Sequence, residues 1–183
     1  ADALGAALAE DVMAPIDVPP FDRSNVDGFA VRSADIVAAG EGNPVRLALN
    51  GETIHCGTAP VLQVAAGTAT VIATGGPLPR GADAVVMVEH TQPAGPDAIE
   101  IRRATSPGQF VSYAGSDIAR GEALLRAGTI IGSREIGMLA ACGIAQVSVA
   151  RRPRVAIIST GDELVQPGQP LRPAAIYDTN GAI

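Results

Sequence analysis

The chain has 183 residues, of which 47% are apolar and 17% are charged, so it can form a packed core and is not a disordered segment. All 13 basic residues are arginine, which excludes a Schiff-base or P-loop lysine, and the net charge of −6 argues against a general nucleic-acid binder. No apolar run approaches the roughly 20 residues of a membrane-spanning helix and no signal peptide is apparent, so we expect a cytoplasmic protein without membrane contact.

The first residues combine a helical pattern with a proline-rich segment. Apolar residues recur at helical spacing from Leu4 to Val12, which predicts a helix over Ala1–Val12. Three prolines then favour extended chain over Met13–Phe21, because proline and the residue before it disfavour helix.

Short β-prone runs separated by Gly, Pro and Asn occupy the chain from Gly28 to about Ala114. The predicted strands are Val45–Leu49, Thr68–Ala73, Ala84–Glu89, Ala98–Arg102 and Phe110–Tyr113. Strands of this length and spacing are typical of a small β-rich domain, either a barrel or a sandwich.

A different pattern follows from Gly115 to Ala150. We predict a turn at Ala127–Thr129 and a helix over Arg134–Ala141, with Ser133 as its N-cap and Cys142-Gly143 as its end. A strand over Gln146–Val149 is predicted after it.

The run Arg151–Arg154 is predicted to be a domain boundary. Val155–Ile158 is wholly apolar, as in a strand of a parallel sheet that is buried on both faces. Asp178 is predicted to cap a helix that has barely begun when the sequence ends. One strand and one helix start cannot bury a sheet, so residues 151–183 are interpreted as the opening of an incomplete α/β domain.

Three loops combine polar side chains with turn residues. In the first, a proline segment leads into an Asp27-Gly28 turn that can hold a carboxylate in a fixed position; a tight turn stabilised by Ser24 and Asp27 is the alternative. In the second, Thr74, Gly75 and Gly76 can present N–H groups to an oxyanion, or merely connect two strands.

The third loop, Ser159–Leu164, follows the apolar strand Val155–Ile158. Ligands of open α/β sheets bind at the carboxyl ends of strands, and Asp162 and Glu163 can hold Mg²⁺ there, although a capped, solvated turn is equally compatible with the pattern. Asp117 is a weaker candidate.

The remaining reactive side chains show no catalytic or metal-binding spacing. Cys56 and Cys142 are predicted to be small buried hydrophobic residues. His55 and His90 have no partners at metal spacing and are predicted to be structural or exposed.

The order of these motifs is more specific than any one of them. The runs PPFDRSNVDGFAVR, ATGGPLPRGADAVVMVE, GSDIARGEALLRAGT and PRVAIISTGDELVQPGQPL, followed by DTNG, cover nearly the whole chain. In this order and spacing the chain resembles the molybdopterin molybdenumtransferases, the MoeA family, whose eukaryotic relatives include the E domain of gephyrin.

The resemblance implies an α+β multi-domain fold. An elongated linker domain would combine residues 1–27 and 116–150, a β-rich barrel-like domain would occupy residues 28–115, and residues 151–183 would begin a truncated MogA-like α/β domain. It implies an enzyme that inserts molybdate into adenylylated molybdopterin and releases AMP, with a divalent cation such as Mg²⁺. It also implies a homodimer, with a MogA-like adenylyltransferase and molybdoenzyme chaperones as possible partners.

On the same resemblance, four residues match positions linked to activity: Asp27, Thr74, Asp117 and Glu163. Substrate contacts are expected from five residues, with the metal held by Asp162 and Glu163. These five are Ser24, Gly75, Thr160, Gly161 and Asp162.

The chain departs from the family pattern at two places. Asn25 stands where a small residue is usual, and the run Phe110–Asp117 lacks the arginines and the glutamate that commonly precede the aspartate. We expect the 183-residue chain to be inactive alone. The alternatives are a non-catalytic homodimerising scaffold, a divergent paralogue, or a β module that binds sugars or nucleotides.

Overall fold

The computed structural model describes residues 2–182 and contains twelve short strands, one α-helix and three 3-10 turns in that range. The chain divides into two compact units, Ala1–Val149 and Ala150–Ile183, and each is described by itself. The β-rich part of the predicted fold is confirmed, because the chain is mostly β with few helices. The α+β division into several domains stays a prediction. None of the helices in residues 2–182 is long and apolar enough to cross a membrane.

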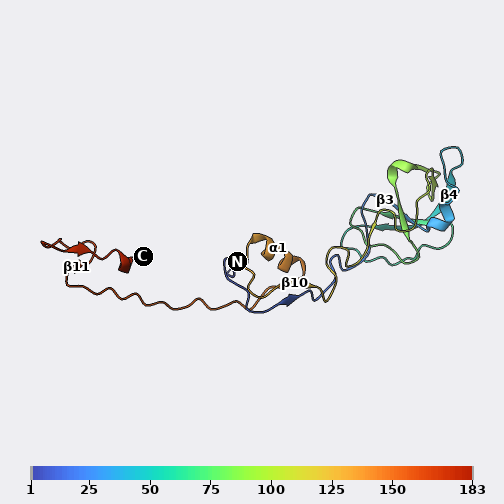
Figure 1. Ribbon diagram of the computed structural model, residues 1–183. Coiled ribbons are helices and arrows are strands. Elements are labelled where there is room, and N and C mark those ends of the chain that lie inside the picture. Colours follow the sequence, from blue (N-terminus) through green and yellow to red (C-terminus); the bar gives the residue numbers. More distant parts are fainter. Residues whose placement is uncertain (1, 183) are drawn as a thin grey trace. The chain divides into compact units, whose positions relative to one another are not determined.

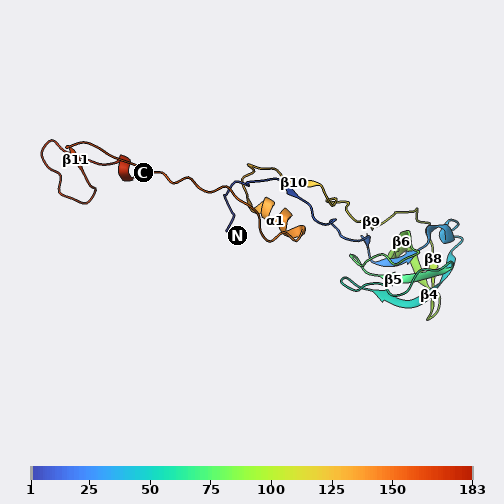
Figure 2. The ribbon, with the colours of Figure 1, turned by 90° about the horizontal axis from the view of Figure 1, so that it is seen from below.

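A six-stranded sheet forms the larger part of the first unit (Figures 1 and 2). In spatial order its strands are β6 (Ala84–Met87), β3 (Gly28–Val31), β5 (Thr68–Ile72), β4 (Val45–Ile54), β8 (Ala98–Ile101) and β7 (Thr91–Pro93). Only β4 and β5 are parallel; every other neighbouring pair is antiparallel. The short turns η1 (Ser33–Ile36) and η2 (Val88–His90) follow β3 and β6.

Strand β3 is at the centre of the core because it is buried on both faces. Phe29 and Val31 belong to one hydrophobic cluster with Leu47, whereas Ala30 packs in another with Ile72. The alternation follows from the two-residue period of a strand. The continuous apolar run Phe29–Val31 is therefore a doubly buried strand, in addition to the strands predicted from the sequence.

The rest of the first unit contains smaller pairings and the helix. Strand β2 (Arg23–Ser24) pairs with β9 (Val111–Ser112), and β1 (Val12–Met13) pairs with β10 (Ala123–Leu125). Helix α1 (Ser133–Ala141) packs its Leu139 against Leu8, Leu125 and Ile131. Figure 1 shows α1 next to β10.

The predicted helix over Ala1–Val12 is wrong. Residues 2–5 form a turn in which Gly5 has φ +78°, and the chain then runs extended into β1. The backbone pairs with a distant segment instead of with itself: Leu8 N–H donates to the Thr129 carbonyl at 2.9 Å, and Ile131 N–H donates to the Ala6 carbonyl at 2.9 Å. Long-range pairing has overridden a local apolar pattern, because helix propensity is a weak preference.

Helix α1 agrees with the prediction except at its start. Ser133 is the first helical residue, and the N-cap is Gly132, whose N–H donates to the Glu135 carboxylate at 2.9 Å. Gly143 ends the helix with φ +72°, as predicted from the Cys142-Gly143 pair. The predicted strand over Gln146–Val149 is wrong, because only an isolated bridge joins Val149 to Leu8.

The predicted turn at Ala127–Thr129 is confirmed, and the structure shows what fixes it. Asp11 accepts a hydrogen bond from Ala127 N–H at 2.8 Å and an ion-paired one from Arg126 at 2.7 Å. The Ala127 N–H, and then the Arg126 side chain, lower the pKa of the Asp11 carboxyl. An exposed carboxylate thus anchors the turn to the segment before β1.

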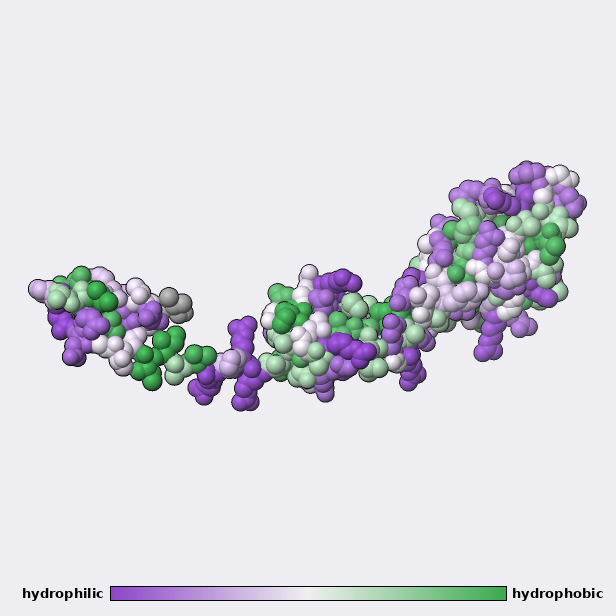
Figure 3. All heavy atoms as spheres, in the orientation of Figure 1, coloured by the Kyte–Doolittle hydropathy of each residue, from purple (hydrophilic) through white to green (hydrophobic). Residues whose placement is uncertain are grey.

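The second unit contains one small pairing and an uncovered apolar segment. Strands β11 (Leu164–Val165) and β12 (Ile176–Tyr177) are parallel, and the 3-10 turn η3 (Asn180–Ala182) follows. The predicted buried strand Val155–Ile158 is wrong: Val155 is 78% exposed and Ile158 83%, and nothing among residues 2–182 pairs with this segment. Figure 3 shows hydrophobic atoms at the surface of this stretch. An apolar run becomes a strand only where a neighbouring strand accepts its hydrogen bonds.

Gly28 gives a test of the tight packing around β3. A Cβ on Gly28 would lie 1.9 Å from the Val86 carbonyl oxygen, which belongs to the paired strand β6. We expect Gly28→Ala to lower the free energy of unfolding by about 1–3 kcal/mol, since a strand pairing must move apart. Denaturant unfolding will measure the loss.

The matched control is Gly42→Ala, where an added methyl group would meet no atom within 4 Å. This variant is expected to unfold at the same denaturant concentration as the wild type. Equal midpoints for the two variants would show that the close approach at Gly28 has no cost.

Candidate functional site

Asp27 and Thr74 are brought together by the register of two antiparallel strands. Gly28 lies opposite Ile72 in the β3–β5 pair, so the residue before β3 and the residues after β5 meet at one end of the sheet. Asp27 Oδ1 accepts hydrogen bonds from Thr74 N–H at 2.7 Å and from Thr74 Oγ1 at 2.9 Å. The two residues that resemblance places in one site are therefore in direct contact.

The same hydrogen bonds determine the charge of Asp27. The Thr74 backbone N–H, and then the Thr74 hydroxyl, hold the pKa of the Asp27 carboxyl below its ordinary value of 3.8. Asp27 is exposed and is a carboxylate at neutral pH. Its Oδ2 has no hydrogen-bond partner within residues 2–182, so one carboxylate oxygen is left for a ligand or a proton.

Ser24 is the buried support of this corner, with 1% of its surface exposed. Its hydroxyl donates to the Val26 carbonyl at 2.6 Å, which closes the turn before Asp27. Its backbone bonds the facing loop, because Ser24 N–H donates to the Gly76 carbonyl and Gly75 N–H donates to the Ser24 carbonyl. The Ser24 hydroxyl therefore bonds nearby backbone, as in the tight-turn alternative, whereas the Asp27 carboxylate accepts its bonds from the distant Thr74.

The N–H groups of Thr74, Gly75 and Gly76 are all engaged. They donate to Asp27, to the Ser24 carbonyl and to the Ala73 carbonyl, respectively. An oxyanion at this loop would have to displace one of these bonds. Substrate binding by Gly75 stays a prediction, and its physical basis is weaker than the glycine pair suggests.

Asp117 lies apart from this contact. Its N–H donates to the Val18 carbonyl at 2.9 Å, and its exposed side chain makes no hydrogen bond within residues 2–182. The altered run before it has a visible partner: the Ser112 hydroxyl donates to Asn25 Oδ1 at 2.7 Å. The two departures from the family pattern therefore contact each other across β2 and β9.

Two residues near Asp27 were not among the predicted site residues. His55 lines a pocket of about 250 Å³ together with Asp27, Thr53 and an apolar floor that includes Phe29. Cys56 was predicted to be buried, which is wrong: it is exposed, and its thiol donates to the Thr74 carbonyl at 2.9 Å. Cys142 is buried, as predicted. No local spacing links residues 55 and 56 to Asp27, because strand pairing alone brings them close.

The second unit contains the other candidates. Thr160, Gly161, Asp162 and Glu163 lie in an exposed loop before β11. No group of three or more metal-binding side chains occurs among residues 2–182. Mg²⁺ is commonly held by one or two carboxylates together with waters and substrate phosphates, so the adjacent pair Asp162 and Glu163 fits part of such a site.

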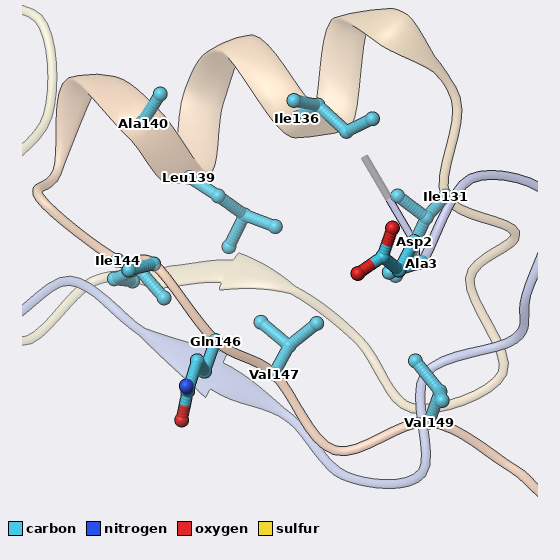
Figure 4. A pocket seen from close by; sticks show the side chains of 11 residues that line it. Asp2, Ala3, Ile131, Ile136, Leu139, Ala140, Ile144, Gln146, Val147 and Val149 are labelled. Atoms are coloured by element: carbon cyan, nitrogen blue, oxygen red, sulfur yellow. The ribbon is translucent and has the colours of Figure 1, made fainter.

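A larger cavity, of about 440 Å³, lies beside α1 (Figure 4). Its lining is apolar apart from Asp2 and Gln146, with Ile136 and Leu139 of the helix facing Val147. None of the predicted site residues lines it. Size alone does not make it the functional site, because it lacks converging polar groups.

The Asp27–Thr74 contact can be tested by titration. In Thr74→Val the hydroxyl donor is lost while the backbone N–H remains, so we expect the pKa of Asp27 to rise toward its ordinary value. In the wild type the ionised carboxylate stabilises the fold above pH 3.8, and this contribution is lost as the pH falls through the lowered folded-state pKa. Carboxyl carbon NMR of Asp27 measures the shift. Thr129→Val is the control, because the Thr129 hydroxyl makes no hydrogen bond to a carboxylate within residues 2–182, and it should leave this pKa unchanged. Equal values in all three proteins would contradict the assignment.

Comparison with known proteins places this geometry in a family. Residues 1–143 match the family model described as the MoeA N-terminal region, domains I and II. Molybdopterin molybdenumtransferase 2 of Mycobacterium tuberculosis is 43% identical over 97% of this chain and 44% of its own length. Molybdopterin molybdenumtransferase of Bacillus subtilis is 41% identical over 100% of this chain and 43% of its own length.

A solved structure gives the same result. The molybdopterin biosynthesis MoeA protein from Pyrococcus horikoshii superposes with a TM-score of 0.92 at 44% identity, over 98% of this chain and 46% of that one. The chain thus spans less than half the length of these relatives. Since the family model matches well over half of its residues, the chain belongs to the MoeA family and corresponds to the N-terminal part of its members.

Proposed function

We propose that the protein acts in molybdenum cofactor biosynthesis as a molybdopterin molybdenumtransferase. In the proposed reaction, molybdate enters adenylylated molybdopterin and AMP is released. The proposal is supported by membership of the MoeA family and by relatives that are named for this activity. The observation that carries it is the contact between Asp27 and Thr74, residues far apart in sequence that resemblance alone had assigned to one site.

The structure supports distinct roles for the residues around Asp27. The Asp27 carboxylate is charged, exposed and oriented by Thr74, so it can accept a proton or orient a donor group of the substrate through Oδ2. The backbone N–H and the hydroxyl of Thr74 both donate to Asp27. We therefore assign Thr74 the role of orienting the carboxylate, in preference to binding phosphate or molybdate. Ser24 fixes the backbone of both loops.

The remaining parts of the proposal concern the whole protein. Asp162 and Glu163 would hold Mg²⁺, with waters and the substrate phosphate completing its coordination. The ion would neutralise the negative charge of the substrates. The chain has no lysine that could do so. We further propose a cytoplasmic homodimer with a linker domain (residues 1–27 and 116–150), a β-rich domain (28–115) and an α/β domain that starts at residue 151. Asp117 would approach the substrate only in that assembly.

Following AMP release tests the proposed reaction. The protein, extended to the length of its relatives and here called the full-length protein, is mixed with adenylylated molybdopterin, molybdate and Mg²⁺. We expect the full-length protein to release AMP and the 183-residue chain to release none. If the full-length protein is folded and dimeric but releases no AMP, the enzymatic proposal is wrong and the scaffold alternative is favoured.

A matched pair of variants tests the role of Asp27. Asp27→Asn is expected to lower kcat by about 10²-fold or more, the size associated with a positioned acid–base group. Asp35→Asn is the control, because Asp35 also accepts a backbone hydrogen bond, from Gly67 at 2.9 Å, but does not contact Thr74. Equal losses in the two variants would assign Asp27 a structural role only.

A further inference from the structure

Asp178 is a buried carboxylate in the second unit that is not among the predicted site residues. Only 6% of its surface is exposed. Its Oδ1 accepts a hydrogen bond from the Ser159 hydroxyl at 2.9 Å and another from Gly181 N–H at 2.8 Å. The second bond holds the short 3-10 turn η3, which contains Gly181, at the place where the sequence predicts the start of a helix. The first bond reaches a loop 19 residues earlier in the chain.

That loop, Ser159–Glu163, is held at both ends by the segment around β12. Ile176 N–H donates to the Glu163 carbonyl at 2.9 Å, which continues the parallel pairing of β11 with β12. Asp178 N–H donates to the Val165 carbonyl at 2.9 Å, and the Asp178 side chain then turns back to Ser159. The loop is thus fixed by one strand bond at Glu163, by the side-chain bond from Ser159 to Asp178, and by a bond from Arg172 Nη2 to the Asp162 carbonyl at 2.9 Å.

Gly161 lets the Glu163 side chain fold over this loop. Its φ is +151°, and a Cβ there would lie 2.6 Å from Glu163 Oε2 and 2.7 Å from Oε1. The Glu163 carboxylate therefore occupies the space that any larger residue at position 161 would fill. The position of this carboxylate depends on the path of the loop between Ser159 and Glu163.

Hydrogen bonds, and not apolar contacts, hold the loop. Every residue from Arg151 to Glu163 is exposed, so apolar packing contributes little to its conformation. Hydrogen bonds to a carboxylate are among the strong ones in proteins, and the bond from Ser159 to Asp178 is of this kind. A buried carboxylate also loses hydration, and the hydrogen bonds from Ser159 and Gly181 offset part of that loss.

We propose that Asp178 is a positioning residue: through Ser159 and Gly181 it fixes the loop Ser159–Glu163 and thereby the Glu163 carboxylate. The inference rests on the proposed function, because the positioned group is Glu163. Asp178 acts through the loop and does not itself touch the reacting atoms.

The kinetic test uses the full-length protein and the AMP-release assay. Ser159→Ala removes the bond to Asp178 and is expected to lower kcat by about tenfold or more with little change in KM. Ser159→Thr keeps the hydroxyl and is expected to restore kcat. The matched control is Tyr177→Phe, at the residue that precedes Asp178 in the sequence. It removes a hydroxyl that donates to the Gln169 carbonyl outside the loop. The kcat of this variant should stay that of the wild type.

A double-mutant cycle separates positioning from general damage. If Ser159 and Asp178 act through Glu163, the kcat loss in Ser159→Ala should disappear when Glu163 is already glutamine, because residues that act as a unit are not additive. Additive losses would overturn the proposal. So would a loss in Tyr177→Phe as large as that in Ser159→Ala, or no loss in Ser159→Ala.

Hydrogen exchange gives a readout that is independent of activity. The Gly181 amide should exchange faster in Asp178→Ala than in the wild type, and stay protected in Asp178→Asn, because asparagine also caps. If the Gly181 amide exchanged at the wild-type rate in Asp178→Ala, the proposed positioning role of Asp178 would be overturned. AMP release by the wild-type protein tests the proposed function. The ratios of kcat between variants, and the exchange rates of the Gly181 amide, test the role of Asp178. A failure of one proposal can therefore be told from a failure of the other.

Discussion

The absence of a side chain at Gly28 is the constraint on which the first unit depends. Strand β3 is paired on both edges and buried on both faces, and Gly28 begins it against the carbonyl of Val86. A neighbour this close fixes where β3 starts. The residue before it, Asp27, is then held by two contacts: its carbonyl accepts from Val88 N–H, and its carboxylate meets Thr74. The packing of β3 therefore also determines how the Asp27 carboxylate is oriented.

The two units hold their candidate side chains by different means. In the first, a core of strands delivers Asp27 and Thr74 to the same end of a sheet, and the polar contact is the result of that packing. In the second, the loop Ser159–Glu163 has hardly any apolar support, and polar bonds to Asp178, Arg172 and Ile176 determine its path. Because the loop has so few apolar contacts, we expect it to open more readily than the sheet does.

Local pattern predicted the elements whose cause is local. The strands at residues 45–49, 68–73, 84–89 and 98–102 were recognised because each alternates or clusters β-prone residues between turns, and α1 because its end is marked by Gly143. The helix expected at Ala1–Val12 failed for the opposite reason. Its residues pair with the distant segment that contains Leu125, Thr129 and Ile131, and nothing in a short window records that partner.

The candidate site shows the same limit. Resemblance grouped Asp27 with Thr74, but the contact between them follows from strand register, which a one-residue slip would destroy. The engaged N–H groups of Gly75 and Gly76 could not be read from a glycine pair, since their acceptors are Ser24 and Ala73. The exposed run Val155–Ile158 was wrongly predicted to be a buried strand. Apolar composition indicates that a segment needs a partner, but it does not show that a partner strand is present.

The contrast between the two cysteines has a practical consequence. Cys142 is 1% exposed, whereas Cys56 is open to solvent with its sulfur on the Thr74 carbonyl. A thiol-directed reagent will therefore modify Cys56 first, without any engineered cysteine. A fluorine or fluorescent tag attached there would sit beside the carboxylate loop and change its signal when that loop rearranges. The chain thus carries its own attachment point for a spectroscopic reporter of the Asp27–Thr74 corner.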